Sequence, residues 1–346
     1  MIGAVLAGSA HTRRPDEPHP AGSDVDLLIF VDSEVPSEIL EPHGRFAPRK
    51  LVFRGVVLEP SFHDARRIAD PEVVLGDVHL APVFCDPDIL FDASGRLQKL
   101  ASAVKPAFHQ RTHIHRRLHH AFHPPSPAGP GIVVQDLPAL RAPCWRNAFF
   151  AFDIGRAASA VLVAGRRYPT VRRSFIVARE VLCQAGREDL ADALLRLLGS
   201  FGLSPSDVES LAAELERSYD VAVELRRTPV VMDWNVSRDA RELERAAVRE
   251  MIGAGYHRES LFHVLLLRTV VQGILENDAP GEVLSPSRAG YGRLLEALGI
   301  EGSEALHNRE RELRGFMPVL QGFCEDLVAT LSTGENGFEN RAGEPV

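Results

Sequence analysis

The sequence is poor in cysteine. Its 346 residues include only four, and no two of them form a CxxC pair. Such isolated cysteines imply neither a disulfide framework nor a zinc knuckle. The pattern is typical of a reducing compartment, and we expect a cytoplasmic location. The four cysteines are Cys85, Cys144, Cys183 and Cys324.

The sequence also lacks the marks of a membrane or secreted protein. No uninterrupted apolar run reaches the roughly 20 residues that cross a bilayer. The first ten residues, MIGAVLAGSA, are apolar and small but include no basic residue. We therefore interpret them as a strand rather than a signal peptide, and we expect no membrane partner.

An excess of positive charge is missing as well. The chain has 47 acidic and 39 basic residues, and its net charge is −8 at pH 7. Proteins that coat nucleic acids carry basic surfaces, so a nucleic-acid partner is disfavoured. Apolar residues make up 45% of the chain, which is enough for a sizeable core without disulfides.

The first part of the chain, up to about residue 95, has a mixed α and β pattern. Residues 2–7 and 26–31 are short apolar runs bounded by turn residues, as is typical of buried strands. We expect a third strand within 50–62, ended by Pro60. The remaining expected elements are a short helix at 36–42 and an apolar segment at 89–91.

After about residue 96, almost every segment has helical spacing. Breakers that contain glycine or proline separate these segments, and Ser204-Pro205 is typical of a helix start. The expected helices cover 145–164, 171–186, 189–200, 206–226, 237–254, 258–276, 288–298 and 303–331.

These patterns predict an α+β fold, in which a small mixed-sheet domain precedes a larger all-helical domain. The stretch HPPSPAGPG marks a linker between the two. The predicted organisation is a mixed-sheet domain at 1–98, a helix and Pro/Gly-rich linker at 99–131, a helical domain at 132–332 and a flexible tail at 333–346.

Two aspartates lie at the start of the second expected strand. Side chains at positions i and i+2 of a strand point to the same face, so Asp24 and Asp26 project together. Two carboxylates this close repel each other unless a cation lies between them. Glu59, at the end of the third strand, could add a third carboxylate, and such a group suits two Mg²⁺ ions about 4 Å apart.

More ordinary interpretations of these acids stay open. Asp24 and Asp26 could be solvated residues of a capping loop, and Glu59 could be an exposed strand end. Asp64 is then the substitute for Glu59, although capping of a following helix explains Asp64 equally well.

A Gly-Ser turn follows the first expected strand directly. Gly8 lets backbone N–H groups approach an anion, and the Ser9 hydroxyl adds another donor. A phosphate at this turn would lie beside the aspartate pair. The order of strand, Gly-Ser, loop, Asp-x-Asp, strand and Glu is much more specific than any of its parts.

This order of motifs resembles the nucleotidyltransferase superfamily, which has the DNA polymerase β-like fold. The stretches LAGS and GSDVDLLIFVD are similar to its minimal members and to its bacterial small-molecule members of the aminoglycoside type. The resemblance covers roughly residues 1–100. The helical remainder resembles, more loosely, the helical domains that follow this fold.

The resemblance implies a Mg²⁺-dependent enzyme. It would transfer a nucleotidyl group, most commonly AMP from ATP although another nucleoside triphosphate could serve, to a hydroxyl of a small-molecule acceptor with release of pyrophosphate. Asp24, Asp26 and Glu59 would bind the metal, with two ions expected, and act in catalysis. The residues that it implies for nucleotide binding are Gly8, Ser9 and Ser23.

Two departures from the family pattern leave other functions open. The loop between Ser9 and Asp24 has 14 residues and three prolines, and the helix that usually precedes the first strand is missing. One alternative is a catalytically degenerate nucleotide-binding or protein-interaction module of the same fold. Another is a toxin–antitoxin-type modifier of protein or RNA. The acceptor, the base preference and the oligomeric state, for which a homodimer is one option, stay open.

Three further segments could contribute to a site. Histidines between 109 and 123 flank an apolar helical stripe; their HxxxH spacing could bind zinc, but without an acidic ligand a solvated or partner-facing flank is the better interpretation. Arg13 and Arg14 could contact phosphates. Tyr168-Pro169 could line an acceptor site or simply connect two helices.

Overall fold

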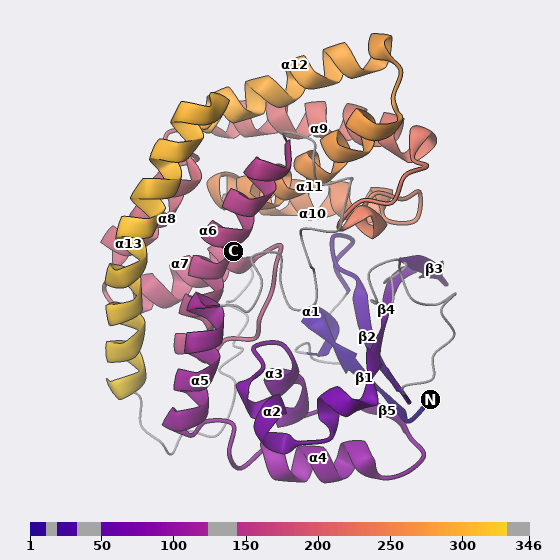
Figure 1. Ribbon diagram of the computed structural model, residues 1–346, viewed down its shortest axis with the longest axis vertical. Coiled ribbons are helices and arrows are strands. Elements are labelled where there is room, and N and C mark those ends of the chain that lie inside the picture. The colour runs from indigo at the N-terminus through magenta and orange to yellow at the C-terminus, as the bar shows by residue number, and fades with distance from the viewer. Residues whose placement is uncertain (12–18, 33–49, 124–143, 331–346) are drawn as a thin grey trace. The chain divides into compact units, whose positions relative to one another are not determined.

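The computed structural model of this chain divides into two compact units (Figure 1). Unit 1 comprises Met1–Ile132, Ser159–Thr170 and Gln321–Val346, and unit 2 comprises Val133–Ala158 and Val171–Leu320. The residues that the structure does not describe are 12–18, 33–49, 124–143 and 331–346. The helix expected at 36–42 and the expected tail lie in these undescribed ranges.

The fold is α+β, as predicted, with a mixed sheet in the N-terminal part and a mostly helical remainder. Each compact unit is built from several segments, whereas the expected domains are continuous. The domain limits read from the sequence therefore stay a prediction.

Unit 1 is built on a five-stranded sheet with the order β3-β4-β2-β1-β5. Strands β2 and β4 are parallel, and the other neighbours are antiparallel. The strands expected at 2–7 and 26–31 are confirmed to within a residue or two, and the apolar segment noted at 89–91 forms a further strand. The strands are β1 (Gly3–Ala7), β2 (Val25–Val31), β3 (Leu51–Phe53), β4 (Val56–Asp64) and β5 (Ile89–Asp92).

The single strand expected within 50–62 is wrong, because this segment forms a hairpin. Arg54 and Gly55 have φ values of 50° and 82°, as a two-residue hairpin turn requires. Pro60 does not end the second strand of the hairpin, which continues to Asp64. The pairing with β3 stops at Leu58, so the missing N–H of Pro60 breaks no hydrogen bond on that side.

Short helices cover one face of the sheet and enclose the core of unit 1. Val5 and Phe30 from the strands pack there with Phe84 and Leu97 from the helices, and all four are almost fully buried. Burial of such side chains contributes about 1.5–3 kcal/mol each. The helical elements are α1 (Gly8–His11), the 3₁₀ turn η1 (Ala65–Ile68), α2 (Pro71–Gly76), α3 (Leu80–Cys85), α4 (Arg96–Val104) and α5 (Arg111–Phe122).

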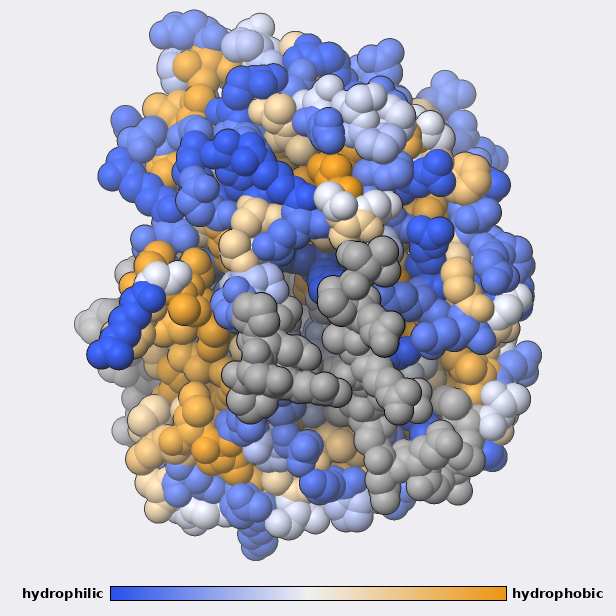
Figure 2. All heavy atoms as spheres, turned by 180° about the vertical axis from the view of Figure 1, so that it is seen from behind, coloured by the Kyte–Doolittle hydropathy of each residue, from blue (hydrophilic) through white to orange (hydrophobic). Residues whose placement is uncertain are grey.

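The two edge strands of the sheet carry exposed apolar side chains. Phe53 and Leu90 are 57% and 60% exposed, and Leu51 and Phe91 are also solvent-accessible. Figure 2 shows a broad apolar area on the left of the molecule in that view.

Unit 2 is helical and is organised around α11 (His257–Asp278), which is buried from Glu259 to Leu275. Helices α7, α8, α9, α10 and α12 all pack against α11. The other elements of this part of the chain are α7 (Ser174–Gln184), α8 (Glu188–Leu198), α9 (Pro205–Leu225), η4 (Asp233–Asn235), α10 (Arg241–Gly253) and α12 (Gly281–Ala297), with α6 (Cys144–Ala164) and α13 (Gly302–Thr330) shared between the units.

The eight helices expected after residue 140 are all present, with ends shifted by a few residues. The largest difference is at α12, which begins at Gly281 instead of 288 and contains Pro286. A proline removes one helical hydrogen bond but does not always end a helix. The helix start expected at Ser204-Pro205 is confirmed, and there Ser204 and Asp207 exchange the two hydrogen bonds of a capping box.

Helix α6 is long and apolar enough to cross a membrane by length and composition alone. Its mean hydropathy is 1.3, but 61% of the apolar window is buried inside the protein. A core helix gives the same result, so this helix is weak evidence for a membrane span.

Candidate metal and nucleotide site

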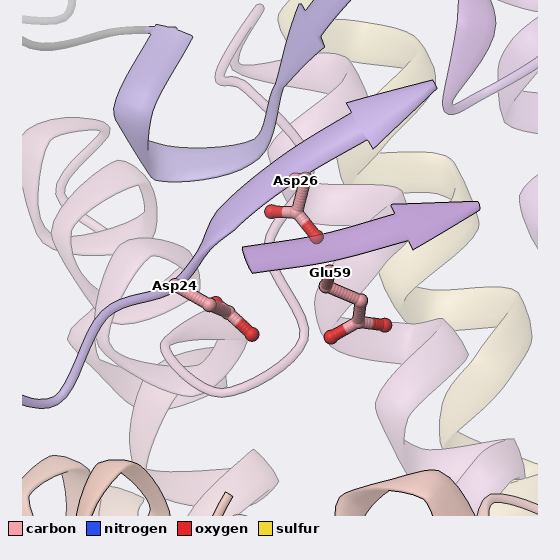
Figure 3. A group of neighbouring side chains, drawn as sticks. All are labelled: Asp24, Asp26 and Glu59. Atoms are coloured by element: carbon pink, nitrogen blue, oxygen red, sulfur yellow. The ribbon is translucent and has the colours of Figure 1, made fainter. Parts of the chain in front are cut away.

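The three acidic residues predicted from the sequence converge in unit 1 (Figure 3). Asp26 on β2 lies opposite Glu59 on β4 in the parallel register, and Asp24 immediately precedes β2. One carboxylate oxygen from each of the three lies within 4.8 Å of the others. Because hard divalent cations prefer oxygen ligands at short range, this group fits Mg²⁺.

A lysine that the sequence analysis did not single out contacts two of these carboxylates. Lys50 directly precedes β3, and its side chain is fully buried. Its Nζ forms an ion pair with Asp24 and lies 2.6 Å from Oε2 of Glu59. A buried ammonium is stable only when it is paired in this way.

The electrostatics of Glu59 reflect its crowded surroundings. Burial raises the pKa of the Glu59 carboxyl, and the negative charge of Asp24 raises it further. The Lys50 ammonium acts in the opposite direction. A bound divalent cation would act in the same direction as Lys50 and favour the ionised form.

Gly8 is required by both its conformation and its surroundings. It has a φ of 69°, in the left-handed region that glycine adopts without strain. A Cβ atom at this position would overlap Oδ2 of Asp26. The Gly-Ser turn therefore lies directly against the aspartate pair, as the sequence analysis expected.

The turn has two further contacts. The Ser9 and Ser23 hydroxyls are hydrogen-bonded to each other, which joins the two ends of the intervening loop. The Gly8 N–H donates to the Tyr168 hydroxyl at 3.0 Å. Burial raises the pKa of Tyr168, so its hydroxyl stays protonated at neutral pH.

Asp64, which the sequence analysis considered as a substitute for Glu59, lies away from the carboxylate group. Asp64 accepts hydrogen bonds from the N–H and side chain of Arg66 and caps η1, five register positions along β4 from Glu59. It is the helix cap, and it takes no part in the carboxylate group. Arg13 and Arg14 lie outside the described residues.

The histidine-rich helix α5 packs its expected apolar stripe into unit 1, with Ile114, Leu118 and Phe122 buried. His119 and His123 are exposed, and their rings lie 4.9 Å apart. Within the described part of the chain, the only group of three or more metal-ligating side chains is the Asp24, Asp26 and Glu59 group.

Comparisons with known proteins add no relative. No protein-family model matches the chain, and no curated protein matches it significantly.

Two contacts of the candidate site have no local signal in the sequence. Tyr168 was considered as a possible acceptor-site residue, but its contact with Gly8, 160 positions away, was not expected. Lys50 is one of only three lysines, with Lys99 and Lys105, in a chain that has 39 lysines and arginines together. This scarcity is the one sequence signal that could have drawn attention to Lys50.

Proposed function

We propose that the protein is a Mg²⁺-dependent nucleotidyltransferase that transfers a nucleotidyl group, AMP from ATP in the simplest case, to a hydroxyl of a small molecule. The convergence of Asp24, Asp26 and Glu59 beside Gly8 is the observation that carries this proposal. Three carboxylates that could bind a hard cation lie beside a turn that could bind phosphate. The resemblance to nucleotidyltransferases implies this combination.

In the proposed reaction, the acceptor hydroxyl oxygen attacks the α-phosphorus of ATP. The bond from this phosphorus to the bridging oxygen breaks, and pyrophosphate leaves. Mg²⁺ held by Asp24, Asp26 and Glu59 would neutralise charge on the phosphates. Ser9, Ser23 and the N–H groups of the Gly8 turn would hold the triphosphate.

Glu59 has a second role in the proposed reaction. In the family that the sequence resembles, the third carboxylate can accept the proton of the acceptor hydroxyl. Glu59 is held on a strand, opposite Asp26, rather than on a loop. A base in a fixed position lowers the entropic part of the barrier.

A nucleotide-binding module without catalysis is the second candidate. The Tyr168 hydroxyl accepts a hydrogen bond from the Gly8 N–H, and this N–H would otherwise be able to donate to a phosphate. If Tyr168 keeps this position when nucleotide binds, the phosphates would sit away from the turn and catalysis would be impaired.

The test compares two substitutions of aspartate by asparagine in unit 1. With Mg-ATP and a panel of hydroxyl-bearing acceptors, Asp24→Asn combined with Asp26→Asn should lower pyrophosphate release at least ~100-fold. Asp64→Asn, which removes only the ion pair between Asp64 and Arg66, should leave it within a few-fold. Unchanged release in the double variant would rule out the site. Saturable binding of Mg-ATP without release by the wild type would favour the module.

A further inference from the structure

Strand β2 is apolar on both of its faces. Leu28 and Phe30 point to the face that packs against the helices, where Phe30 is part of the core and Leu28 packs against it. Leu27 and Ile29 alternate with them and therefore point to the other face, which we call the outer face. A strand that faces water on one side normally alternates apolar with polar residues. The sequence of β2 thus predicts a second covering layer over the outer face.

The register of the strands extends the outer face over the whole sheet. Residues that lie opposite each other on neighbouring strands point to the same face. Asp64, which caps η1 at the end of β4, is the only charged residue that the described strands place on this face. The outer face runs from β5 to β3 through Phe91, Leu6, Leu27, Leu58 and Phe53.

The outer face keeps apolar side chains accessible at both of its edges. Phe91 on β5 is 43% exposed and Phe53 on β3 is 57% exposed, whereas the residues between them are half-buried. Helices α3 and α4 contribute Phe84 and Leu97 to the core on the opposite face, together with Val5. The exposed aromatic rings are therefore separate from the core of unit 1.

The size of the outer face suits a reversible contact between proteins. Neighbouring strands lie about 4.8 Å apart and successive same-face residues about 6.7 Å apart, so the outer face covers roughly 400 Å² in projection. Monomeric proteins rarely expose contiguous apolar patches larger than a few hundred Å². The relief of the side chains adds to the projected area and brings it toward the lower end of specific interfaces, about 600 Å² on each partner.

The composition of the outer face favours a second copy of the chain as the partner. Interfaces between identical subunits are more apolar than interfaces with transient partners, and charged residues are depleted at their centre. A twofold axis lets one patch serve both copies, and two sheets can pack face to face. An anionic membrane surface is a poorer partner, because the chain has a net charge of −8.

We propose that the chain forms a reversible homodimer in which the outer faces of two sheets pack against each other across a twofold axis. Asp26 and Glu59 alternate with outer-face residues of β2 and β4, so they point to the opposite face. The carboxylate group therefore stays outside this interface. The inference does not depend on the proposed function.

The test is sedimentation velocity of the full chain over a range of concentrations. The wild type should show a monomer–dimer equilibrium with a Kd on the order of 10 µM, as a small interface allows. Phe91→Glu should weaken the dimer at least ~10-fold, because the twofold axis places two added charges in each interface. Phe91 is already 43% exposed on an edge strand, so the variant should fold. Phe53→Glu, at the opposite edge, should weaken the dimer in the same way.

The matched control is Val73→Glu. Val73 is also in unit 1 and is 59% exposed, but it lies on α2 and not on the sheet. This variant adds the same charge and should keep the wild-type Kd. Circular dichroism should be the same for all four forms. Their binding of Mn²⁺, a substitute for Mg²⁺ that electron paramagnetic resonance detects, should also be the same.

Three results would overturn the dimer. One is a wild type that stays monomeric at all concentrations, which would assign the outer face to another partner or to a segment outside the described residues. The others are a dimer that neither glutamate on the sheet weakens, and one that Val73→Glu weakens equally. A dimer that both sheet variants disrupt would support the proposal even if no form binds Mn²⁺, so this inference and the proposed function fail separately.

Discussion

Each unit of this protein buries acidic side chains, but the two units compensate them differently. In unit 2, Glu244 is 2% exposed and bonds to His263 Nε2 at 2.7 Å, with Arg172 at 3.6 Å. Glu259 is similarly buried and pairs with Arg179 at 2.8 Å. Glu244 and Glu259 therefore each pair with basic side chains of their own.

In unit 1 the acidic side chains are arranged differently. Asp24, Asp26 and Glu59 are grouped together, and among the described residues Lys50 is the one cation in ion-pair contact with them. Burial alone therefore does not distinguish the two groups of acids. The close grouping of three carboxylates does, because hard divalent cations prefer several oxygen ligands at short range.

The first prediction tests whether the pairing in unit 2 is structural. His263→Leu removes the hydrogen bond to the buried Glu244 carboxylate while keeping an apolar residue of similar size. Loss of a buried charged hydrogen bond costs about 3 kcal/mol of unfolding free energy. Both tryptophans, Trp145 and Trp234, belong to unit 2, so tryptophan fluorescence during urea unfolding measures this loss.

His307→Leu is the control in the same unit. His307 is 62% exposed and lies 3.9 Å from Glu310, so its removal should change stability by less than about 0.5 kcal/mol. Mn²⁺ binding should be unchanged in both variants. A His263 variant with normal stability but altered Mn²⁺ binding would contradict the division between a structural and a functional cluster.

The second prediction concerns the turn beside the aspartates. Gly8→Ala introduces strain at a φ of 69° and an overlap with Asp26, so we expect a loss of about 2 kcal/mol and at least ~10-fold weaker Mn²⁺ binding. Hydrogen exchange of unit 1 and Mn²⁺ titration measure the two effects.

Gly55→Ala separates strain from overlap. Gly55 has a φ of 82°, but a Cβ there would meet no atom within 4 Å. This variant should lose about 1 kcal/mol from strain alone and keep its Mn²⁺ affinity. Equal weakening of Mn²⁺ binding in the two variants would mean that the overlap with Asp26 has no role.

The periodic parts of this fold were predictable from the sequence. Apolar runs and helical spacing are local signals, and they placed β1, β2 and all the helices after residue 140. The Asp-x-Asp pattern also implied that Asp24 and Asp26 share a face, and Glu59 joined them as expected. These inferences used only the alternation of side chains along one strand and the position of its neighbouring strand.

The failures were at non-local features. The hairpin depends on two residues with positive φ, Arg54 and Gly55, and the sequence Arg-Gly is not among the strongest hairpin signals. This hairpin positions Lys50 beside Glu59, so the missed turn and the missed lysine have one cause. Tyr168 reaches Gly8 through tertiary packing, for which no local pattern exists.

The last prediction is a pH dependence of the stability of unit 1. Burial, helped by the charges of Arg166 and Arg117, lowers the pKa of His109 in unit 1 to about 4. In the unfolded chain His109 binds a proton near pH 6.5, whereas in the folded chain it stays neutral until about pH 4. The free energy of unfolding is therefore highest above pH 6.5 and falls as the pH drops toward 4. Between pH 7 and 5 we expect a loss of about 2 kcal/mol in unit 1, measured by hydrogen exchange. His109→Asn should reduce this slope, and an unchanged slope would show that other groups in unit 1 cause it.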